Sequence, residues 1–267
     1  MVDQISSFSN PLIKRVKRLR QKKYRRQDGL YFVEGLRVVL SAVEANAPIE
    51  TIIYCPALLT SDVAWNMLRR REQLGTRLQA VSAPVFASIS GRDNPVGLGA
   101  IVRAQWTDLA DLTAGADDIF VALFEAAEPG NLGTIMRTMD AIGARGVILV
   151  GDSVDPFHPS AVKASMGALF SLSLSQIADS EALFSWAESS DLLTVASSAS
   201  GATPSDEANY QLPVLLLLGN EGAGLPASVT AASEFTVAIS MAGAASSLNL
   251  AVAAGLLLYE IRRSSAA

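Results

Sequence analysis

The sequence predicts an α/β protein of two domains, the second of which holds a parallel β-sheet covered by helices on both faces. In residues 119–267, short continuous apolar runs such as VLLLLG at 214–219 alternate with stretches of helical periodicity, and buried parallel strands have this pattern. Residues 1–105 alternate shorter strand-like and helical segments. Between the two, WTDLADLTAGADD at 106–118 has no clear period and carries turn residues, so we expect it to be a linker.

The N-terminal domain is expected to open with a basic helix over about residues 11–26, which begins after Asn10 and ends before Gly29. The rest of this domain is expected to alternate strands and helices, because its apolar residues recur with the spacing of one or the other. We predict strands at 30–35, 49–55, 77–83 and 97–104 and helices at 36–46 and 60–75.

The C-terminal domain is expected to follow the strand–helix alternation of a parallel sheet. Its final helix, SLNLAVAAGLLLYEIRR, is apolar on nearly every side, so we expect it to be buried in a core or between subunits. We predict strands at 119–126, 146–151, 192–199, 214–219 and 235–240 and helices at 130–143, 158–169, 180–190 and 247–263.

The composition excludes several kinds of site. The single cysteine, Cys55, and the single histidine, His158, exclude an internal disulfide, a cysteine metal cluster and the HExxH motif, so we expect no metal site. No apolar run reaches about 18 residues, so we expect no membrane span. The first residues, MVDQISSFSN, lack the apolar core of a secretory signal. The simplest interpretation is a cytoplasmic protein.

Basic residues are concentrated at one end of the chain. Residues 1–117 hold 16 Lys and Arg against 11 Asp and Glu, whereas residues 118–267 hold 5 against 15. Nine of the 21 basic residues lie in KRVKRLRQKKYRR at 14–26. Because so few acidic residues balance this run, a nucleic-acid contact is favoured over a solvated basic face.

The loop GNEGAGLP at 219–226 follows an apolar strand and places a carboxylate, Glu221, among three glycines. Its glycine spacing fits neither the dinucleotide fingerprint GxGxxG nor the phosphate-binding loop GxxxxGK[ST]. A carboxylate would also repel a phosphate. The loop therefore favours a neutral or cationic ligand, and a plain strand-to-helix turn is the alternative.

The stretch EPGNLGTIMRTMDAIG at 128–143 predicts a helix with two informative polar positions. Asn131 can cap its first turn. Arg137 is flanked by apolar residues, and a buried arginine requires a partner. We expect that partner to be a phosphate or a carboxylate, and a structural ion pair with Asp140 or Glu128 is the alternative.

The stretch SMAGAASSLNLAVAAG at 240–255 places Ser246, Ser247 and Asn249 at the start of an otherwise apolar helix. Capping explains one of these residues. It does not account for an asparagine within the first turn beside two leucines.

These three stretches, in this order and spacing, resemble the SpoU/TrmH-type RNA 2'-O-ribose methyltransferases of the SPOUT class. The matching motifs are EPGNLGTIMRT, LGNEGAGL and SLNLAVA. DPFHPSAVKASMGALF at 155–170 is similar to the stretch between the first two motifs in this family. NPLIKRVKRLRQKKYRRQDGLYFVEGLRVV is similar to the family's N-terminal substrate-binding domain, and GRDNPVGLGAIVR to the members that methylate ribosomal RNA.

The resemblance implies a C-terminal SPOUT domain with a parallel sheet and a deep trefoil knot, and a smaller ribosomal-protein-like α/β domain before it. It implies S-adenosylmethionine as cofactor, a sulfonium cation without a phosphate, which makes an acidic residue in the glycine loop tolerable. It also implies a homodimer with the active site at the subunit interface. The cofactor-binding positions that match the motifs are Leu218, Gly219, Glu221, Gly222, Ile239, Met241 and Leu248.

The activity that the resemblance implies is methyl transfer to a ribose 2'-hydroxyl of RNA, with 23S rRNA favoured by the N-terminal domain. Arg137 is the residue usually given the base role. Because a guanidinium scarcely deprotonates in proteins, we expect it to clamp a phosphate and stabilise the developing alkoxide. Asn131, Ser247 and Asn249 are expected to orient the ribose and the arginine, with Glu221 as an acceptor. The expected RNA-binding residues are Lys14, Arg15, Lys17, Arg18, Lys22, Lys23, Arg25 and Arg26.

Three alternatives accompany this interpretation. A non-catalytic RNA-binding or assembly factor would keep the fold without the chemistry, although both sets of polar motif residues are present. A tRNA 2'-O-methyltransferase is the second, since TrmH-type members include tRNA and rRNA enzymes. A Rossmann-type dinucleotide enzyme is disfavoured by the glycine spacing. His158 stands where the family often has asparagine, and we interpret it as a turn residue.

Overall fold

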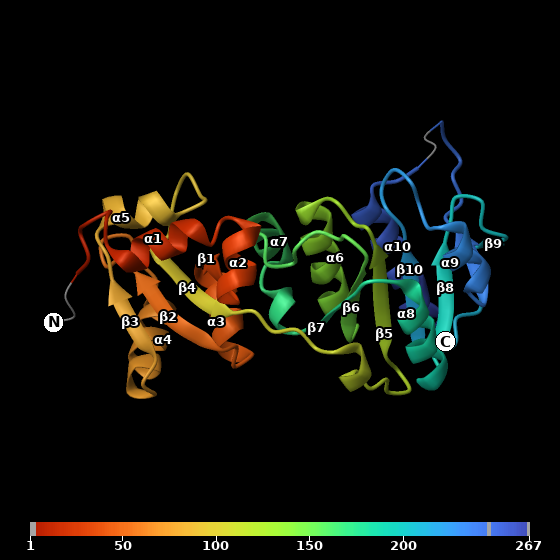
Figure 1. Cartoon of the computed structure of the whole chain (residues 1–267), viewed down its shortest axis with the longest axis horizontal. Helices are drawn as coiled ribbons and strands as arrows, with labels where there is room; N and C mark the ends of the chain where they lie inside the picture. The colour runs from red at the N-terminus through yellow and green to blue at the C-terminus, as the bar shows by residue number, and fades with distance from the viewer. Residues whose placement is uncertain (1–3, 245–246, 266–267) are drawn as a thin grey trace. The chain divides into compact units, whose positions relative to one another are not determined.

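The computed structural model describes residues 4–244 and 247–265, which fold into two compact units (Figure 1). Unit 1 comprises Met1–Ala104 and Asp155–Phe170, and unit 2 comprises Gln105–Val154 and Ser171–Ala267. The chain thus first passes from one unit to the other next to the predicted linker. However, Asp155–Phe170 folds with unit 1, whereas we predicted it within the C-terminal domain. No helix in these described ranges is long and apolar enough to cross a membrane.

Unit 1 is built on a four-stranded sheet of order β1-β4-β2-β3, in which β4 pairs antiparallel with β1 and β2 and β3 pairs parallel with β2. Its core gathers apolar side chains of the sheet, α1 and α5, among them the fully buried Ile13, Phe86 and Ile101. The strands are β1 (Leu30–Glu34), β2 (Ile49–Tyr54), β3 (Arg77–Ala80) and β4 (Leu98–Arg103). The helices are α1 (Pro11–Arg18), α2 (Lys22–Asp28), α3 (Leu36–Glu44), α4 (Asp62–Gln73), α5 (Ala83–Ile89) and α7 (Pro159–Ser165), followed by the short η2 (Ala168–Phe170).

The basic N-terminal run forms two helices, α1 and α2, where we predicted one over residues 11–26. The chain between them turns Leu19 into the core, where it is 1% exposed. Asn10 caps α1 by accepting a hydrogen bond from the backbone N–H of Leu12 at 2.9 Å. Gly29 ends α2 in the left-handed region at φ 63°. The basic run is therefore divided between two short helices and does not form one long helix.

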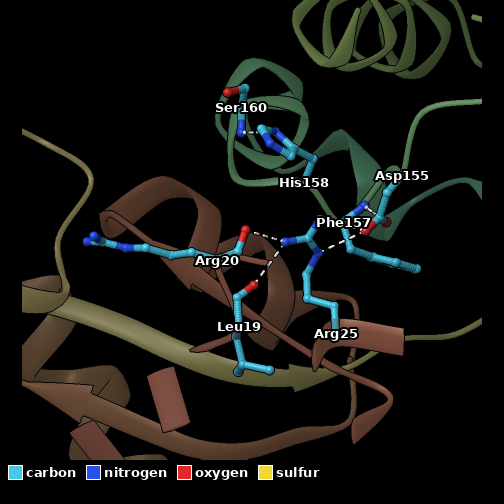
Figure 2. Close-up of polar contacts among 7 residues, drawn as sticks. All are labelled: Leu19, Arg20, Arg25, Asp155, Phe157, His158 and Ser160. Atoms are coloured by element: carbon cyan, nitrogen blue, oxygen red, sulfur yellow. Dashed lines mark hydrogen bonds and ion pairs between the residues drawn. The ribbon is translucent and has the colours of Figure 1, made fainter. Parts of the chain in front are cut away.

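A buried ion pair holds the segment Asp155–Phe170 on unit 1 (Figure 2). Arg25 is 3% exposed, and its Nε and Nη2 lie 2.8 and 2.7 Å from Oδ2 of Asp155. Nη1 donates to the carbonyl oxygens of Leu19 and Arg20 at 2.9 and 2.8 Å. The prediction that Arg25 binds RNA is therefore wrong, because its guanidinium is neutralised inside the protein.

Two neighbours of Asp155 extend this contact. The ring of Phe157 packs against that of Tyr31, with centroids 4.6 Å apart. His158 caps α7, because its Nδ1 accepts a hydrogen bond from the backbone N–H of Ser160 at 3.2 Å. Burial and then the positive charge of Arg25 lower the pKa of His158, so the imidazole is neutral near pH 7 and can accept that bond. This geometry agrees with its interpretation as a turn residue.

Unit 2 contains a seven-stranded sheet of order β7-β6-β5-β10-β8-β11-β9 in which every pair is parallel, as predicted for the C-terminal domain. The strands β7 and β9 and the helix α9 were not predicted. The strands are β5 (Ile119–Phe124), β6 (Gly146–Val150), β7 (Ser173–Ile177), β8 (Leu193–Ser197), β9 (Thr203–Pro204), β10 (Val214–Leu218) and β11 (Phe235–Ala238). The helices are α6 (Pro129–Ala141), α8 (Ser180–Ser189), α9 (Ala227–Ala232) and α10 (Leu250–Ser265), preceded by the short η1 (Leu109–Asp111).

Helices cover this sheet on both faces. On one face, alternate side chains of β5, β6 and β10 pack with α8, α9 and η1, and the rings of Phe120 and Trp186 meet edge to face at 5.1 Å. On the other face, α10 contacts α6 and β10. The predicted linker belongs to this core: Leu112 is 6% exposed, and its carbonyl accepts a hydrogen bond from Nε1 of Trp186 at 3.0 Å.

We predict that Asp155→Asn destabilises unit 1, because it leaves the charge of Arg25 buried and uncompensated. Loss of one partner of a buried ion pair costs about 3 kcal/mol. Faster amide hydrogen exchange in β1 and β4 would report this loss. The matched control is Asp93→Asn, which removes an exposed carboxylate from the same unit. Equal protection in the two variants would show that the ion pair does not stabilise the unit.

Candidate active site

The three polar motifs meet at one edge of the sheet of unit 2. Because the strands are parallel, the carboxyl ends of β5, β8, β10 and β11 lie at the same edge, where α/β proteins bind ligands. The segment that starts α6 follows β5, the glycine loop follows β10, and the segment that leads into α10 follows β11. Residues far apart in the sequence thus approach one another here.

The glycine loop after β10 is a tight turn closed by its own backbone and by Asn220. The backbones of Asn220 and Gly224 exchange two hydrogen bonds, of 3.2 and 2.9 Å. Oδ1 of Asn220 accepts from the N–H of Gly222 at 2.8 Å, and its Nδ2 donates to the carbonyl of Glu125 at 2.8 Å. A Cβ on Gly219 would lie 2.1 Å from the backbone carbon of Gly224, so the turn excludes any side chain at position 219.

A chain of hydrogen bonds connects the three motifs through Glu221, Asn131 and Asn249. Nδ2 of Asn131 donates to Oε1 of Glu221 at 3.0 Å, and Nδ2 of Asn249 donates to Oδ1 of Asn131 at 3.0 Å. Oδ1 of Asn249 accepts from the backbone N–H of Ala251 at 3.0 Å, so Asn249 caps α10 and does not lie within its first turn, as we had expected. Conversely, Asn131 lies inside α6 and does not cap it. Each amide is therefore used at both ends, which fixes its orientation in this network.

The carboxylate of Glu221 is held in its charged form. Burial by itself would raise its pKa. The hydrogen bonds from the side chain of Asn131 and from backbone N–H groups, including that of Ala127 at 3.4 Å, favour the anion and together outweigh burial, so the pKa is lowered. Glu221 is consequently an anion and a weak base at neutral pH.

Beside this network lies a cavity of about 540 Å³, here named the sheet-edge cavity. Its volume is within the range of about 300–1,000 Å³ that small-molecule sites occupy. Its lining includes all seven predicted cofactor residues, Leu218, Gly219, Glu221, Gly222, Ile239, Met241 and Leu248, together with Ser247. Sequence reasoning missed further lining residues, which are Ser197, Ser198, Ala199, Asn220, Ala223, Gly224, Leu225, Thr230, Leu250 and Ala253.

The charge of the sheet-edge cavity selects among ligands. Glu221 is the one ionisable side chain that lines it among the described residues. No lysine or arginine among the described residues lines the cavity, so none is present there to neutralise a phosphate. The cavity therefore suits a cationic or neutral ligand. Ser247, which we predicted to orient the ribose, is exposed and lines the cavity. Ser246 lies outside the described residues.

Arg137 is exposed, which corrects the prediction that it is buried. The buried face of α6 consists of Leu132, Gly133, Ile135, Met136 and Met139. Arg137 projects from another side of the helix, although it lies between two of these residues in sequence. Among the described residues it has no ion pair or hydrogen bond, so neither Asp140 nor Glu128 pairs with it.

The final helix, α10, is buried on one side and presents apolar side chains on another. Leu257, Leu258 and Ile261 are fully buried, as the prediction of a buried helix requires. However, Leu256 and Tyr259 are 45% and 61% exposed. With Val252, also half exposed, they lie on one side of the helix at a spacing of three and four residues. This exposed apolar strip is unusual for a surface that faces only water.

The predicted RNA-binding residues differ in exposure. Arg25 is buried, as described above, and Arg15 pairs with Glu50 at 2.6 Å. Three cations lie over aromatic rings: the guanidinium of Arg18 and Nζ of Lys23 are 5.1 and 5.9 Å from the ring of Tyr24, and Nζ of Lys17 is 5.6 Å from that of Phe8. The exposed members are Lys14, Arg18, Lys22, Lys23 and Arg26, and Arg20, which we did not predict, is exposed as well.

Comparison with known proteins agrees with this geometry. Residues 118–259 match the SpoU rRNA Methylase family, and residues 10–100 match the MRM3-like substrate binding domain. The chain is 33% identical to a 23S rRNA (uridine(2479)-2'-O)-methyltransferase from Streptomyces viridochromogenes, over 92% of this chain and 86% of that protein. It is 25% identical to the 23S rRNA (guanosine(2553)-2'-O)-methyltransferase RlmP of Bacillus subtilis, over 97% and 99% of the two chains.

The fold also matches solved structures over nearly its whole length. An AdoMet-bound rRNA methyltransferase from Sinorhizobium meliloti superposes with a TM-score of 0.90 and 35% identity, over 98% of each chain. Both the parallel sheet and the N-terminal unit are therefore shared with that protein. The likeness is far too extensive to rest on the sheet-edge motifs alone.

We predict that Asn131→Ala raises the pKa of Glu221, because it removes the side-chain hydrogen bond that favours the carboxylate. Since the folded-state pKa lies below that of the unfolded chain, the contribution of Glu221 to stability is present at neutral pH and is lost as the pH falls through the lowered pKa. An NMR titration of its carboxyl carbon measures the shift. Thr134→Ala on the same helix is the control. An unchanged titration in Asn131→Ala would remove the basis for the network.

Proposed function

The chain belongs to the SpoU rRNA methylase family, and from that premise we propose that it transfers the methyl group of S-adenosylmethionine to a ribose 2'-hydroxyl of 23S rRNA. The observation that carries this proposal is the sheet-edge cavity. Its lining combines the family's motif residues with a single carboxylate and no cation among the described residues. Relatives whose names specify 2'-O-methylation of 23S rRNA support the same reaction and substrate.

The residues of the cavity fit S-adenosylmethionine. That cofactor carries a positive sulfur and no phosphate, which agrees with an anionic Glu221 and with the lack of a lysine or arginine in the described lining. Leu218, Ile239 and Leu248 provide apolar walls, and the tight turn at Gly219 exposes backbone groups to the cavity. When bound, the cofactor would supply the methyl group: the 2'-oxygen would take the methyl carbon, the electron pair of the broken carbon–sulfur bond would stay on sulfur, and the hydroxyl proton would pass to water.

The protein's own part in the reaction is positioning and stabilisation of charge. Asn131 and Asn249 are fixed by their hydrogen bonds and would orient the ribose, with the hydroxyl of Ser247 at the cavity. Arg137 is exposed, so its planar guanidinium is available for a phosphate of the RNA, where it would stabilise the developing alkoxide. Glu221, a weak base, serves as a hydrogen-bond acceptor in this scheme.

Unit 1 would supply most of the RNA contacts. Its match to a substrate-binding domain and the exposed cations of α1 and α2 support this role. Tyr24 and Phe8, which lie beside cations of these helices, are aromatic rings on which bases can stack. Binding through Lys14, Arg18 and Lys22 would weaken steeply with salt, because phosphate contacts release counterions.

We also propose a homodimer whose interface includes the exposed apolar strip of α10. Covering this strip would bring a second subunit next to α6, which packs against α10 and carries Arg137. The trefoil knot implied by the family resemblance is part of the same proposal, and in it the loops after β10 and β11 would both line the cavity, as they do here. We place the activity in the cytoplasm with its RNA substrate.

The reaction is tested with tritiated S-adenosylmethionine offered separately with unmodified 23S rRNA, 16S rRNA and tRNA. We predict label in 23S rRNA that survives alkaline digestion as a resistant dinucleotide. Label in tRNA would identify the tRNA alternative, and cofactor binding without label in any RNA would favour the non-catalytic RNA-binding factor.

Arg137→Lys should lower kcat/KM about 100-fold, because a lysine lacks the planar fork. Arg145→Lys, an exposed arginine of the same unit, is the control. Near-full activity in Arg137→Lys would reject the clamp.

The dimer is tested by sedimentation velocity. We predict a dimer for the natural chain and a monomer for Leu256→Glu, because a charge in a packed apolar interface is strongly disfavoured. Methyl transfer should fall with the loss of the dimer, since the active site lies beside the interface. Val63→Glu, on an apolar residue that is 58% exposed in unit 1, is the matched control. A monomeric natural chain would overturn the proposal.

A further inference from the structure

Unit 1 contains a second cavity that the proposed reaction does not use, here named the unit 1 cavity. Its volume is about 190 Å³. It lies between the end of β1, the loop after α5 and the start of α7. Two aromatic rings, one carboxylate and three cations line it, and these are Phe32, Phe157, Glu34, Arg20, Arg92 and Lys163. Aromatic and cationic side chains together are the composition that proteins use for unpaired nucleotides.

One wall of this cavity comes from the segment Asp155–Phe170. Phe157 and Lys163 lie within the residues that match the methylase family, outside the 10–100 match of the substrate-binding domain. Figure 2 shows how the wall is fixed: Arg25 binds Asp155, and Phe157 follows two residues later. The contact between the rings of Phe157 and Tyr31 also holds this wall in position. The cavity is thus built from parts that are already in place.

Glu34 determines what can enter the unit 1 cavity. Oε2 of Glu34 accepts from the backbone N–H of Gly91 at 2.8 Å, and Oε1 accepts from the hydroxyl of Ser90. These bonds hold the carboxylate in place and leave it further acceptor capacity. A carboxylate repels a phosphate but accepts hydrogen bonds from the amino group of a nucleobase. The inside of the cavity therefore suits a base rather than a phosphate.

The cations suit the phosphate that would remain outside. Nη2 of Arg20 donates to the carbonyl of Ser90 at 2.8 Å, which holds its guanidinium at the cavity, and Figure 2 shows this side chain directed away from the buried Arg25. The guanidinium of Arg92 lies over Gly35, where a Cβ would come within 2.6 Å of its Nη2. Lys163 is exposed on α7. All three cations thus line the same cavity.

We propose that the unit 1 cavity binds one unpaired nucleotide of the RNA substrate. The base enters beside Phe32 and Phe157 and donates an amino hydrogen bond to Glu34, and its phosphate is held by Arg20, Arg92 and Lys163. The volume agrees with this division, because sites for whole drug-sized ligands measure about 300–1,000 Å³. A cavity of 190 Å³ accommodates the base alone. The proposal rests on the proposed function, since it names a contact with the same RNA.

The first test measures binding of the full chain to unmodified 23S rRNA by filter binding. Lys163→Glu should weaken binding at least tenfold, because it replaces an attractive charge at the phosphate by a repulsive one. Arg70→Glu makes the same charge change on α4 of the same unit and should change affinity less than threefold. Equal losses in the two variants would overturn the proposal, because a diffuse positive field would then explain both.

The second test detects the base itself. In the Phe32→Trp variant, the fluorescence of the introduced indole should be quenched by GMP and CMP, and at higher concentration by UMP, which lacks an amino group. Ribose 5-phosphate and inorganic phosphate should have no effect. Quenching by ribose 5-phosphate equal to that by GMP, or no quenching by any mononucleotide or by rRNA, would overturn base binding.

Cofactor titration of the same variants separates this proposal from the proposed function. Lys163→Glu should bind S-adenosylmethionine like the natural chain and raise the KM for rRNA with little change in kcat. Nucleotide binding in a chain that neither binds the cofactor nor methylates RNA would reject the proposed function and keep the cavity. Normal methylation by a Lys163→Glu variant with an unchanged KM would reject the cavity and keep the function.

Discussion

The hydrogen-bond chain from Glu221 through Asn131 to Asn249 is the interaction on which the site depends. It joins three segments that follow different strands, so the geometry of the sheet edge is set by two amides and one carboxylate. Each amide oxygen and each amide nitrogen can play only one role, which makes the arrangement specific. The anionic state of Glu221 belongs to the same arrangement, because the bonds that position it also stabilise its charge. Structure and electrostatics of the site thus have one cause.

Much of this fold could be predicted from the sequence. The continuous apolar runs of β5, β6 and β10 identify buried parallel strands, and parallel strands bring their carboxyl ends together. The glycine spacing and Glu221 favoured a neutral or cationic ligand over a phosphate. By contrast, β7 was missed because Ser173, Ser175 and Gln176 interrupt the continuous apolar run by which the other strands were identified, and β9 has only two residues. The helix α5 was missed as well, since its seven residues are too few to show a period.

The errors on charged residues have a common origin. Arg25 was assigned to RNA because it lies in a basic run, and Arg137 was expected to be buried because its neighbours are apolar. Sequence neighbours on a helix point in different directions, so neither inference can fix the side on which one residue lies. The partner of Arg25 lies 130 residues away in the sequence, and nothing local predicts it. Such long-range pairs are visible only once the fold is known.

The segment Asp155–Phe170 folds with unit 1 although it lies within the methylase family match, and this limits where the protein can be divided. A fragment cut at the boundaries of the methylase family match would contain this segment but not the unit on which it packs. Asp155 would lose its cation, and the apolar residues Phe157, Val162 and Leu169, which are buried here, would face water. The boundaries of sequence families and of folded units therefore differ in this protein. A soluble catalytic fragment requires this segment to be redesigned or replaced by a short linker.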